Sequence, residues 1–494
     1  MTSYVTTTIP YVNARPHLGF VLELVQADVL ARHRRVRGDA VRLLTGTDDN
    51  SLKNVLAAQA EGVPTARLVD RNAAAFAALH RPLSLSFDDF IRTSRDPRHR
   101  PGVERLWQAC AASGDLYRKH YAGLYCVGCE QFYPPAELPG GRCPEHGTEP
   151  TAVAEENWFF RLSRYQERLS DLVSGGTLRI EPAARRNEVL AFIAGGLTDF
   201  SISRSARRAH GWGIPVPGDP DQVVYVWWDA LGNYLSALDY GVDGPDYHRW
   251  WVAADRRVHL VGKGVVRFHA VYWPAMLLSA GVPLPTDILV HDYLTVAGQR
   301  LSKSAGNGVD PLELVDRYGT DAVRWWLLRE VPRVGDTDFT VGKLVARADE
   351  DLANGLGNLV NRVVSMVHRY RGGQVPGAAA PDAGPLGAAV SQAAGRVDAA
   401  LAGFDLRAGT AAVWRIVEEA NRYVERVRPW ELARAADRAA DLDAALAVLV
   451  GACRRVAAEL APFVPDAAAR VAAACTAGPD GRLPAPRPLF RRLG

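Results

Sequence analysis

Hydrophobic and polar positions follow two alternating patterns in the first part of the chain, up to about residue 116. Residues 5–9 are β-branched and rich in Thr, which predicts a buried strand, whereas the apolar residues of 18–37 recur at helical spacing. Later strand patterns occur at residues 223–228, 258–262 and 288–291. Alternating strands and helices predict a parallel α/β domain, here divided by an insertion.

The pattern changes after about residue 345, where the strand signal ends. Ala, Arg and Leu at helical spacing dominate as far as residue 474, with a Gly- and Pro-rich linker at 372–387. This pattern predicts a bundle of helices. The prolines after residue 476 indicate an extended tail that is either docked on the surface or mobile.

The composition is that of a globular enzyme. The 494 residues suffice for two or three domains with complete cores, and 48% are apolar and 23% charged. A formal net charge of +3 means that any contact with nucleic acid must come from local basic surfaces. The longest apolar run, 444–453, is about half the ~20 residues of a membrane span, and the N-terminus lacks a signal-peptide pattern. We therefore expect a cytoplasmic protein without membrane contact.

Four residues with metal-ligand chemistry cluster around a loop rich in Pro and Gly. They are Cys126, Cys129, Cys143 and His146. Two intervening residues within each pair let one tight turn direct both side chains at one ion, so the set predicts a tetrahedral Zn²⁺ site. A redox-active CxxC is the alternative. These four residues lie far along the chain from two candidate phosphate motifs, at 16–20 and 300–304, which favours a structural ion over a catalytic one. The other cysteines, at 110, 453 and 475, lie in apolar helical patterns and are expected to be packed.

One candidate phosphate motif lies where the first predicted helix begins, at Pro16-His17-Leu18-Gly19-Phe20. A helix that starts just after a strand directs unpaired N–H groups and the positive end of its dipole at a ligand, which suits a phosphate. His17 can donate to a phosphoryl oxygen, and Gly19 permits close approach of the ligand to the backbone.

The second candidate motif is Arg300-Leu301-Ser302-Lys303-Ser304, on a loop rich in Gly and Asn. Lys303 supplies a point charge, and Ser302 and Ser304 supply hydrogen-bond donors. Either motif alone is weak. In this order and at this separation, the pair resembles the two ATP signatures of class I aminoacyl-tRNA synthetases.

Seven further segments extend the resemblance over nearly the whole chain, to the methionyl-tRNA synthetase family. In the order of that family they are TTIPYVN at 7–13, LTGTD at 44–48, EENWFF at 155–160, VWWDA at 226–230, FHAVYWP at 268–274, LANGLGNLVNR at 352–362 and RPW at 428–430. The resemblance implies a Rossmann-like catalytic domain (1–116 and 223–290), a connective insertion with a zinc knuckle (117–222), a stem-contact segment (291–345) and a helical anticodon-binding domain (346–494).

The resemblance also implies roles for individual residues. His17 and Lys303 are the catalytic residues, and Pro16, Gly19, Phe20, Gly262, Ser302 and Ser304 bind ATP. Asp48 holds the amino group of the amino acid. The rest of the amino-acid pocket is Ile9, Tyr11, Trp227, Ala230, Leu231, Tyr234, Phe268, His269 and Trp273. A slot lined by aromatic rings suits a polarizable thioether, and a carboxylate suits an ammonium.

In the helical region, the resemblance implies that Asn358, Arg362 and Trp430 read the anticodon. Asn358 and Arg362 are four residues apart, so they lie on one face of a helix. Stacking on aromatic rings and hydrogen bonds to base edges are the usual means of reading single-stranded bases. A solvated Arg and a packed Trp are the alternative interpretation.

The chain departs from the family pattern at four places, all of them expected on the ATP side. Phe20 replaces a second His, and Asp49-Asn50-Ser51 replaces Glu-His-Gly. Gly264 replaces an acidic residue expected to hold the ribose, and Arg300-Leu301 replaces Lys-Met. The loss of one preorganised donor to a transition state typically costs ~2.7–4 kcal/mol.

The expected activity is formation of methionyl-adenylate from methionine and ATP with Mg²⁺, followed by transfer to tRNA(Met). One structural Zn²⁺ and a monomeric state are expected as well. The four departures leave two alternatives open. One is a paralogue in specialised metabolism that passes an activated amino acid to a small hydroxyl or amine, like the synthetase-like half of hydrazine-forming enzymes. The other is a tRNA-binding or regulatory protein without catalysis.

Overall fold

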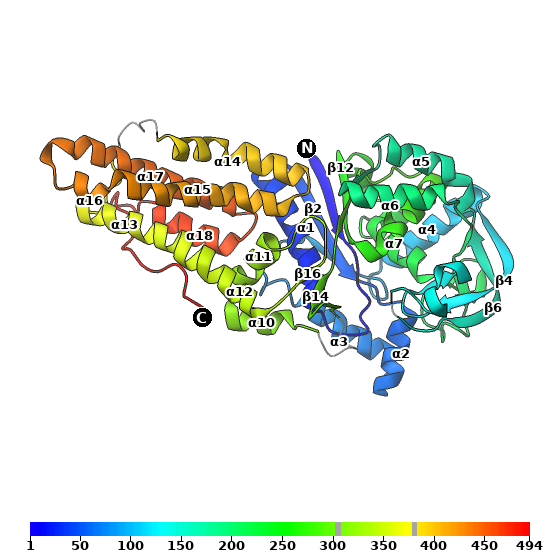
Figure 1. Cartoon of the computed structure of the whole chain (residues 1–494). Helices are drawn as coiled ribbons and strands as arrows, with labels where there is room; N and C mark the ends of the chain where they lie inside the picture. Colours follow the sequence, from blue (N-terminus) through cyan, green and yellow to red (C-terminus); the bar gives the residue numbers. More distant parts are fainter. Residues whose placement is uncertain (146, 302–307, 378–382) are drawn as a thin grey trace.

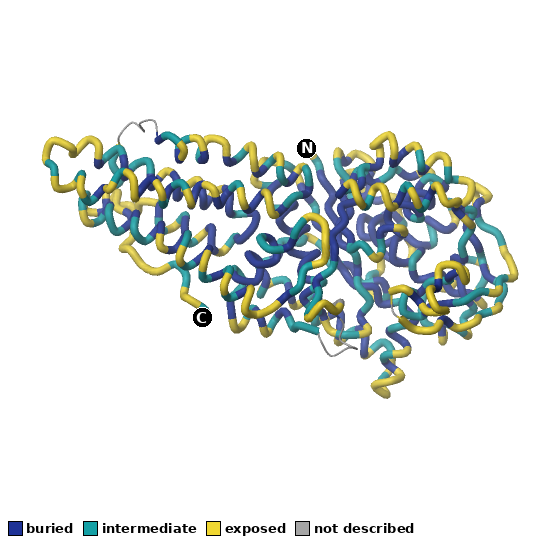
Figure 2. The backbone as a smooth tube through the Cα atoms, viewed as in Figure 1, coloured by how far each residue is buried: buried dark blue, intermediate teal, exposed yellow. Residues whose placement is uncertain are grey.

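The computed structural model describes residues 1–145, 147–301, 308–377 and 383–494. The molecule is elongated: a helical region forms one end, a parallel sheet lies near the middle, and an antiparallel sheet lies at the other end (Figure 1). The burial of the backbone is deepest around the parallel sheet and along the axis of the helical region (Figure 2). None of the described helices is both long and apolar enough to cross a membrane.

The central sheet has six parallel strands in the order β3-β2-β1-β12-β13-β7. Their bounds are β1 Thr2–Thr7, β2 Ala40–Thr47, β3 Asp89–Arg92, β7 Arg179–Glu181, β12 Arg256–Gly262 and β13 Asp287–His291. The chain runs outward from β1 through β2 and β3, and β12 pairs with the other side of β1. The strand order therefore reverses between β1 and β12, and ligands of such sheets bind at the carboxyl ends of the strands at this point.

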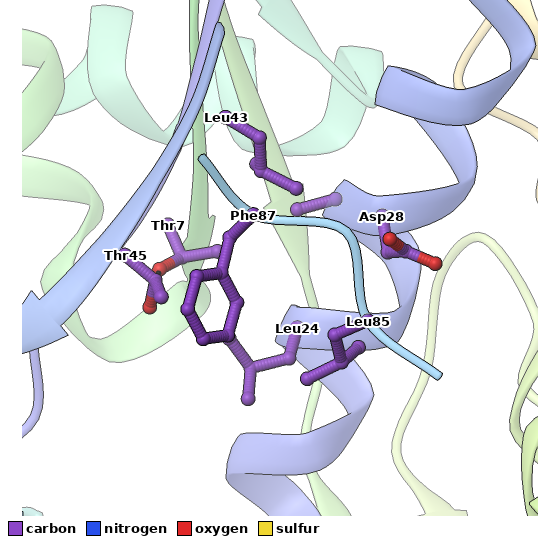
Figure 3. Close-up of a pocket in the computed structure, with 8 residues that line it drawn as sticks. Thr7, Leu24, Asp28, Leu43, Thr45, Leu85 and Phe87 are labelled. Atoms are coloured by element: carbon purple, nitrogen blue, oxygen red, sulfur yellow. Dashed lines mark hydrogen bonds between the residues drawn. The ribbon is translucent and has the colours of Figure 1, made fainter. Parts of the chain in front are cut away.

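Helices cover both faces of this sheet or lie at its carboxyl edge, as βαβ connections require. Their bounds are α1 Leu18–Val36, α2 Leu52–Glu61, α3 Thr65–Ala77, α4 His99–Ala112, α5 Gln166–Ser174, α6 Ala183–Ala194, α7 Val226–Ser236 and α9 Trp273–Ala280. Side chains of α1, β1, β2 and the loop before β3 fill the space between helix and sheet, as Figure 3 shows for Leu24, Leu43 and Phe87. This pocket is packed too tightly for a ligand.

The prediction of a strand at 223–228 is wrong in its second half. Strand β11 (Asp219–Val224) ends at residue 224, and helix α7 begins at residue 226. The strand pairs antiparallel with β9 (Ser203–Ser205) and β10 (Pro215–Val216). Nearly every residue of α7 is buried. A continuous apolar run looks the same in a buried strand and in a helix that is covered on all sides, so periodicity could not separate the two.

The segment between the halves of the parallel sheet forms a separate antiparallel sheet, in the order β5-β4-β6-β8. Its bounds are β4 Leu116–Cys126, β5 Gln131–Tyr133, β6 Thr151–Phe160 and β8 Phe200–Ser201. The loops around β5 carry the cysteine motif. The same segment also contributes β7, which joins the edge of the parallel sheet beside β13.

From residue 308 the described chain is almost entirely helical, which confirms the predicted fold class. The helices are α10 Pro311–Tyr318, α11 Thr320–Arg329, α12 Val341–Arg347, α13 Asn358–Arg371, α14 Pro385–Ala402, α15 Leu406–Val427, α16 Pro429–Leu432, α17 Ala439–Leu460 and α18 Pro465–Cys475. A π-helical stretch, Ala348–Gly357, joins α12 to α13. The tail is docked: the imidazole of His368 contacts the carbonyl of Leu483, and the backbone N–H of Leu493 donates to Asp349.

A buried ion pair joins the parallel sheet to the helical region. Arg324 of α11 is fully buried and donates to Asp28 of α1 at 2.8 Å and to the carbonyl of Phe463 at 2.9 Å. Burial alone would raise the pKa of Asp28, but Arg324 and Arg32 outweigh it and hold that pKa below its usual value. The pair therefore stabilises the fold at pH values above the ordinary pKa of Asp, and this contribution is lost as the pH falls through the lowered pKa.

Replacing Arg324 by Met should lower the free energy of unfolding by ~3–5 kcal/mol, because it leaves Asp28 buried without its main partner. Denaturant unfolding at neutral pH measures this change. Arg415→Met, on the exposed surface of α15, is the control and should change stability by no more than ~0.5 kcal/mol. Asp28→Leu combined with Arg324→Met should recover part of the loss, and an equal loss in the double variant would contradict this role of the pair.

Candidate active site

The N-terminus of α1 lies at the carboxyl end of β1, and His17 caps it. Its Nδ1 accepts the backbone N–H of Gly19 at 3.1 Å. This assigns the proton of the neutral ring to Nε2, which is the donor that a phosphoryl oxygen needs. A Cβ on Gly19 would lie 3.0 Å from His17 Cε1, so a larger residue at this position would force the imidazole to shift.

The described residues on both sides of the loop that carries the second motif reach the same helix terminus. The backbone N–H of Leu18 donates to the carbonyl of Val309 at 3.1 Å. On the other end, Leu301 Cδ1 lies 3.8 Å from the position of a Cβ on Gly19. Two motifs far apart in sequence thus meet at one point. Ser302, Lys303 and Ser304 lie outside the described residues, as does the side chain of Arg300.

The predicted amino-acid pocket residues come from four places and form one group. Ile9 and Tyr11 follow β1, Asp48 follows β2, and α7 carries four more. Phe268 and His269 lie on a π-helical turn, Phe268–Tyr272, which continues into α9 at Trp273. Trp227 stacks on Phe268 with ring centroids 3.7 Å apart, and Tyr11 meets Trp227 edge to face at 6.3 Å.

Tyr234, His269 and Trp273 form the deep side of this group. The hydroxyl of Tyr234 contacts His269 Nε2 at 2.8 Å, and the indole N–H of Trp273 donates to His259 Nε2 at 3.1 Å. Burial lowers the pKa of His269 to about 4 and that of His259 well below its usual value. Both rings are therefore neutral at pH 7, and the surroundings suit an uncharged side chain such as a thioether. Ala230 and Leu231 are buried on the same helix as Tyr234.

Asp48 lies among other carboxyl groups and is 1% exposed. Burial, together with the nearby Asp229, raises the pKa of Asp48 well above its usual value, although a hydrogen bond from the Asn50 backbone opposes this. Three neighbouring carboxyl groups have basic partners, namely Asp49 with Arg92, Asp229 with His99 and Glu130 with Arg204. Among the described residues, Asp48 has no such partner. An ammonium group bound beside it would supply the missing positive charge.

Asn50 is one of the four departures expected on the ATP side, and its contacts are with the carboxyl groups of Asp229 and Asp48. Its side-chain amide donates to Asp229 at 2.7 Å, and its backbone N–H donates to Asp48 at 3.1 Å. The fully buried His99 contacts the other oxygen of Asp229. Asn50 is therefore attached to Asp48, a residue of the predicted amino-acid pocket. The sequence reading missed this network because Asn50, His99 and Asp229 come from three distant segments.

A second buried network that the sequence reading missed involves Glu130, which directly follows Cys129. Glu130 pairs with the buried Arg204 at 2.9 Å and accepts from the Ser51 hydroxyl at 2.8 Å. The carbonyl of Cys129 also accepts the indole N–H of Trp227 at 3.3 Å. The cysteine loop is thereby attached to the start of α2 and to the amino-acid pocket. In the sequence, the only feature that points to this network is that Glu130 directly follows Cys129, a predicted metal ligand.

Three of the four predicted metal ligands lie together. The sulfur atoms of Cys126, Cys129 and Cys143 are all within 4.8 Å of one another, with Cys129 and Cys143 3.4 Å apart. Sulfur ligands at ~2.3 Å from one tetrahedral Zn²⁺ have comparable separations. Burial raises the pKa of the Cys129 thiol, so a cation would be needed to keep that sulfur as a thiolate. The fourth predicted ligand, His146, lies outside the described residues.

Phe20 and Gly264, the two departures beside the predicted ATP motifs, have different surroundings. Phe20 packs edge to face on Phe76 of α3, with centroids 5.0 Å apart. At Gly264, a Cβ would lie only 2.0 Å from the hydroxyl oxygen of Tyr293. Phe20 thus packs in an apolar cluster, and the hydroxyl of Tyr293 fills the space beside Gly264. Gly262, at the end of β12, and the buried Pro16 line the same edge of the sheet.

The three predicted anticodon residues lie far from this site, in the helical region (Figure 1). Asn358 begins α13 and is exposed, whereas Arg362 one turn later pairs with Glu425 of α15 at 2.7 Å. Trp430 lies in the short α16, half-buried against the core of the helical region. The structure gives no direct contact that joins Trp430 to the other two among the described residues.

The fold and the paired motifs are those of a class I tRNA synthetase. The family model described as tRNA synthetases class I (M) matches residues 3–152 and 135–364. The chain is 41% identical to the methionine–tRNA ligase of Brucella melitensis, with 99% of this chain and 97% of the relative covered. For the methionine–tRNA ligase of Mycobacterium bovis, the identity is 41% over 95% of this chain and 91% of the relative. This chain belongs to the methionine–tRNA ligase family.

Solved structures agree with this assignment. A crystal structure of Mycobacterium tuberculosis methionyl-tRNA synthetase bound by methionyl-adenylate matches with a TM-score of 0.94 at 38% identity, covering 99% of this chain and 100% of that one. The ligand-free form of the same protein matches with a TM-score of 0.87 at 36% identity, covering 99% and 98%.

The cysteine cluster should hold one Zn²⁺ per chain, because three sulfurs at this spacing match the ligands of one tetrahedral ion. Elemental analysis of purified protein should give a stoichiometry near one. Cys143→Ser should lose the metal and increase hydrogen exchange in β4–β6 before it does so in β1 and β12. Cys110→Ser, in α4 and away from the cluster, should keep the metal. Zinc-free wild-type protein with unchanged exchange rates would contradict the assignment.

Proposed function

We propose that this chain activates methionine with ATP as methionyl-adenylate and transfers the aminoacyl group to tRNA(Met). The observation that carries the proposal is the position of Asp48 at the end of β2, beside the phosphate-type helix terminus at the end of β1. This edge offers one site for an ammonium and one for a phosphate, which are the two charged groups that must meet in adenylate formation. Family membership supports the same activity.

In the first step, a carboxylate oxygen of methionine attacks the α-phosphorus of ATP. A new P–O bond forms as the bond to the bridging oxygen breaks, and pyrophosphate leaves with its charge. His17 donates from Nε2 to a phosphoryl oxygen, and Lys303 neutralises the pyrophosphate. Mg²⁺ accompanies ATP and offsets phosphate charge when bound. In the second step, a hydroxyl at the end of the tRNA attacks the acyl carbon, and AMP leaves.

Asp48 holds the ammonium of methionine, and the aromatic group around Trp227 and Tyr234 receives the thioether. Pro16, Gly19, Phe20, Gly262, Ser302 and Ser304 form the ATP side. The proposed division of labour follows the predicted boundaries: catalysis at 1–116 and 223–290, a zinc-holding insertion at 117–222, stem contact at 291–345 and anticodon binding at 346–494. We infer a cytoplasmic monomer whose cysteine knuckle holds a structural Zn²⁺.

Methionine-dependent exchange of labelled pyrophosphate into ATP, without tRNA, tests the proposal. Wild-type protein should catalyse it, and Lys303→Ala should lower the rate by ~10²–10³, since it removes one group that stabilises the transition state. Lys343→Ala, on the exposed side of α12, is the control and should leave the rate unchanged. Exchange with another amino acid but none with methionine would instead support an amino-acid-activating paralogue.

Replacing Trp430 by Ala should weaken aminoacylation of tRNA(Met) roughly 5- to 150-fold, because stacking on one base contributes ~1–3 kcal/mol. Pyrophosphate exchange should change less than twofold, since Trp430 is remote from the ATP motifs. Trp430→Phe keeps an aromatic face and should retain most of the charging rate. Equal losses in both assays would show that Trp430 only supports the packing of the helical region.

A further inference from the structure

The turn that follows β2 is held by hydrogen bonds from several segments of the chain. The fully buried Asn54 of α2 donates to the carbonyls of Asp48 at 3.0 Å and of Asp49 at 2.9 Å. The backbone N–H of Asp48 donates to the carbonyl of Pro10 at 2.9 Å. Within the turn, the backbone N–H of Asn50 donates to the Asp48 carboxylate at 3.1 Å. These bonds fix the backbone from which the Asp48 carboxylate is presented.

The side chain of Asn50 joins this turn to α7. Its amide nitrogen donates to Oδ2 of Asp229 at 2.7 Å. The donor must be the amide nitrogen, because an ionised carboxylate only accepts hydrogen bonds. Asp229 lies in the first turn of α7, the helix that also carries Trp227 and Tyr234 of the predicted thioether pocket. One amide therefore connects the turn that carries the predicted ammonium site to the helix that carries the pocket.

Asp229 is itself held in place, so it can serve as an anchor for the amide. Its side chain is fully buried, and its Oδ1 contacts Nε2 of the fully buried His99, the first residue of α4. Nδ1 of His99 contacts the hydroxyl of Ser236, at the end of α7, at 2.8 Å. Both oxygens of Asp229 are engaged. Loss of the Asn50 amide would leave a buried carboxylate oxygen without its donor, which is unfavourable.

An uncharged donor suits position 50 because it lies between two acids. Burial raises the pKa of Asp48, and the negative charge of Asp229 raises it further, so the two carboxyl groups are close enough to repel each other. Asn50 donates to one acid through its backbone and to the other through its side chain, and it adds no negative charge. An aspartate here would have nearly the same shape, but it would replace the donor by a third acid.

We propose that Asn50 is a positioning residue for methionine, which holds the Asp48 carboxylate at a fixed distance from the aromatic pocket on α7. One methionine molecule must place its ammonium at Asp48 and its thioether in the pocket at the same time, so this distance decides how well it binds. Asn50 acts through Asp48 and Asp229 and is not itself a contact of the ligand. This inference rests on the proposed function, and it assigns a role to a residue at which the chain departs from the family pattern.

Pyrophosphate exchange gives the KM for methionine and the KM for ATP separately. Asn50→Ala and Asn50→Asp should each raise the KM for methionine about 10- to 100-fold, as expected for loss of a hydrogen bond to a charged group, and change the KM for ATP less than about twofold. Asn50→His keeps an N–H donor at the δ position. At pH 8, where its imidazole is neutral, it should stay within about fivefold of wild type. The control Asn187→Ala, exposed on α6, should match wild type.

Calorimetric titration separates positioning from general damage to the pocket. The two ligands are L-methionine and 4-(methylthio)butanoic acid, which has the thioether but lacks the ammonium. Asn50→Ala should weaken binding of methionine about 10- to 100-fold and that of the deaminated ligand less than about threefold, because only methionine uses Asp48. Equal losses for the two ligands, or wild-type methionine affinity in both Asn50→Ala and Asn50→Asp, would overturn the positioning role. If wild type binds methionine without exchanging pyrophosphate, the proposed function fails, and the same titrations still decide the role of Asn50.

Discussion

The helix α1 is the element on which the rest of the structure depends. Its first turn presents His17 and the positive end of the helix dipole at the carboxyl edge of the sheet. Near its middle, Asp28 is held by the buried Arg324, which also donates to the carbonyl of Phe463 in the turn between α17 and α18. Helix α1 therefore connects the carboxyl edge of the sheet to the helical region. Any shift of α11 along α1 would leave a buried charge without its partner, at a cost of several kcal/mol.

The second constraint is the crowding of carboxyl groups around the amino-acid side. Asp49, Asp229 and Glu130 each have a basic partner, whereas Asp48 has none among the residues that the structure describes, so its buried, ionised form needs a cation. A preformed site of this kind favours a ligand with an ammonium group over an uncharged analogue. The departures at Asn50 and Ser51 belong to this arrangement, since they bind Asp229 and Glu130. These contacts lie beside the predicted amino-acid pocket and do not involve its aromatic residues.

The insertion is attached to the site at more than one point. Cys129 accepts from Trp227, and Glu130 binds both Ser51 and Arg204. Glu145 and Tyr293 both lie beside Gly264, just after the end of β12. A small domain built around three sulfurs has little apolar core of its own, so a metal ion that fixes its loops would also fix these contacts.

The sequence by itself determined the fold class, the helical C-terminal region and the family, because strand and helix periods and short motifs are local properties. It also predicted that Cys126, Cys129 and Cys143 lie together. A tight turn accounts for the Cys126–Cys129 pair, whereas the fold of the segment between residues 129 and 143 brings Cys143 to it. The sequence pattern wrongly indicated a strand at residues 226–228, because a fully buried helix has no polar face to reveal its period. Local patterns could not predict contacts between segments that are distant in the sequence. Examples are His99 with Asp229, Arg204 with Glu130, and the Tyr293 hydroxyl beside Gly264. Only tertiary structure decides such contacts, because they depend on which strand ends and loops the sheet order brings to one edge.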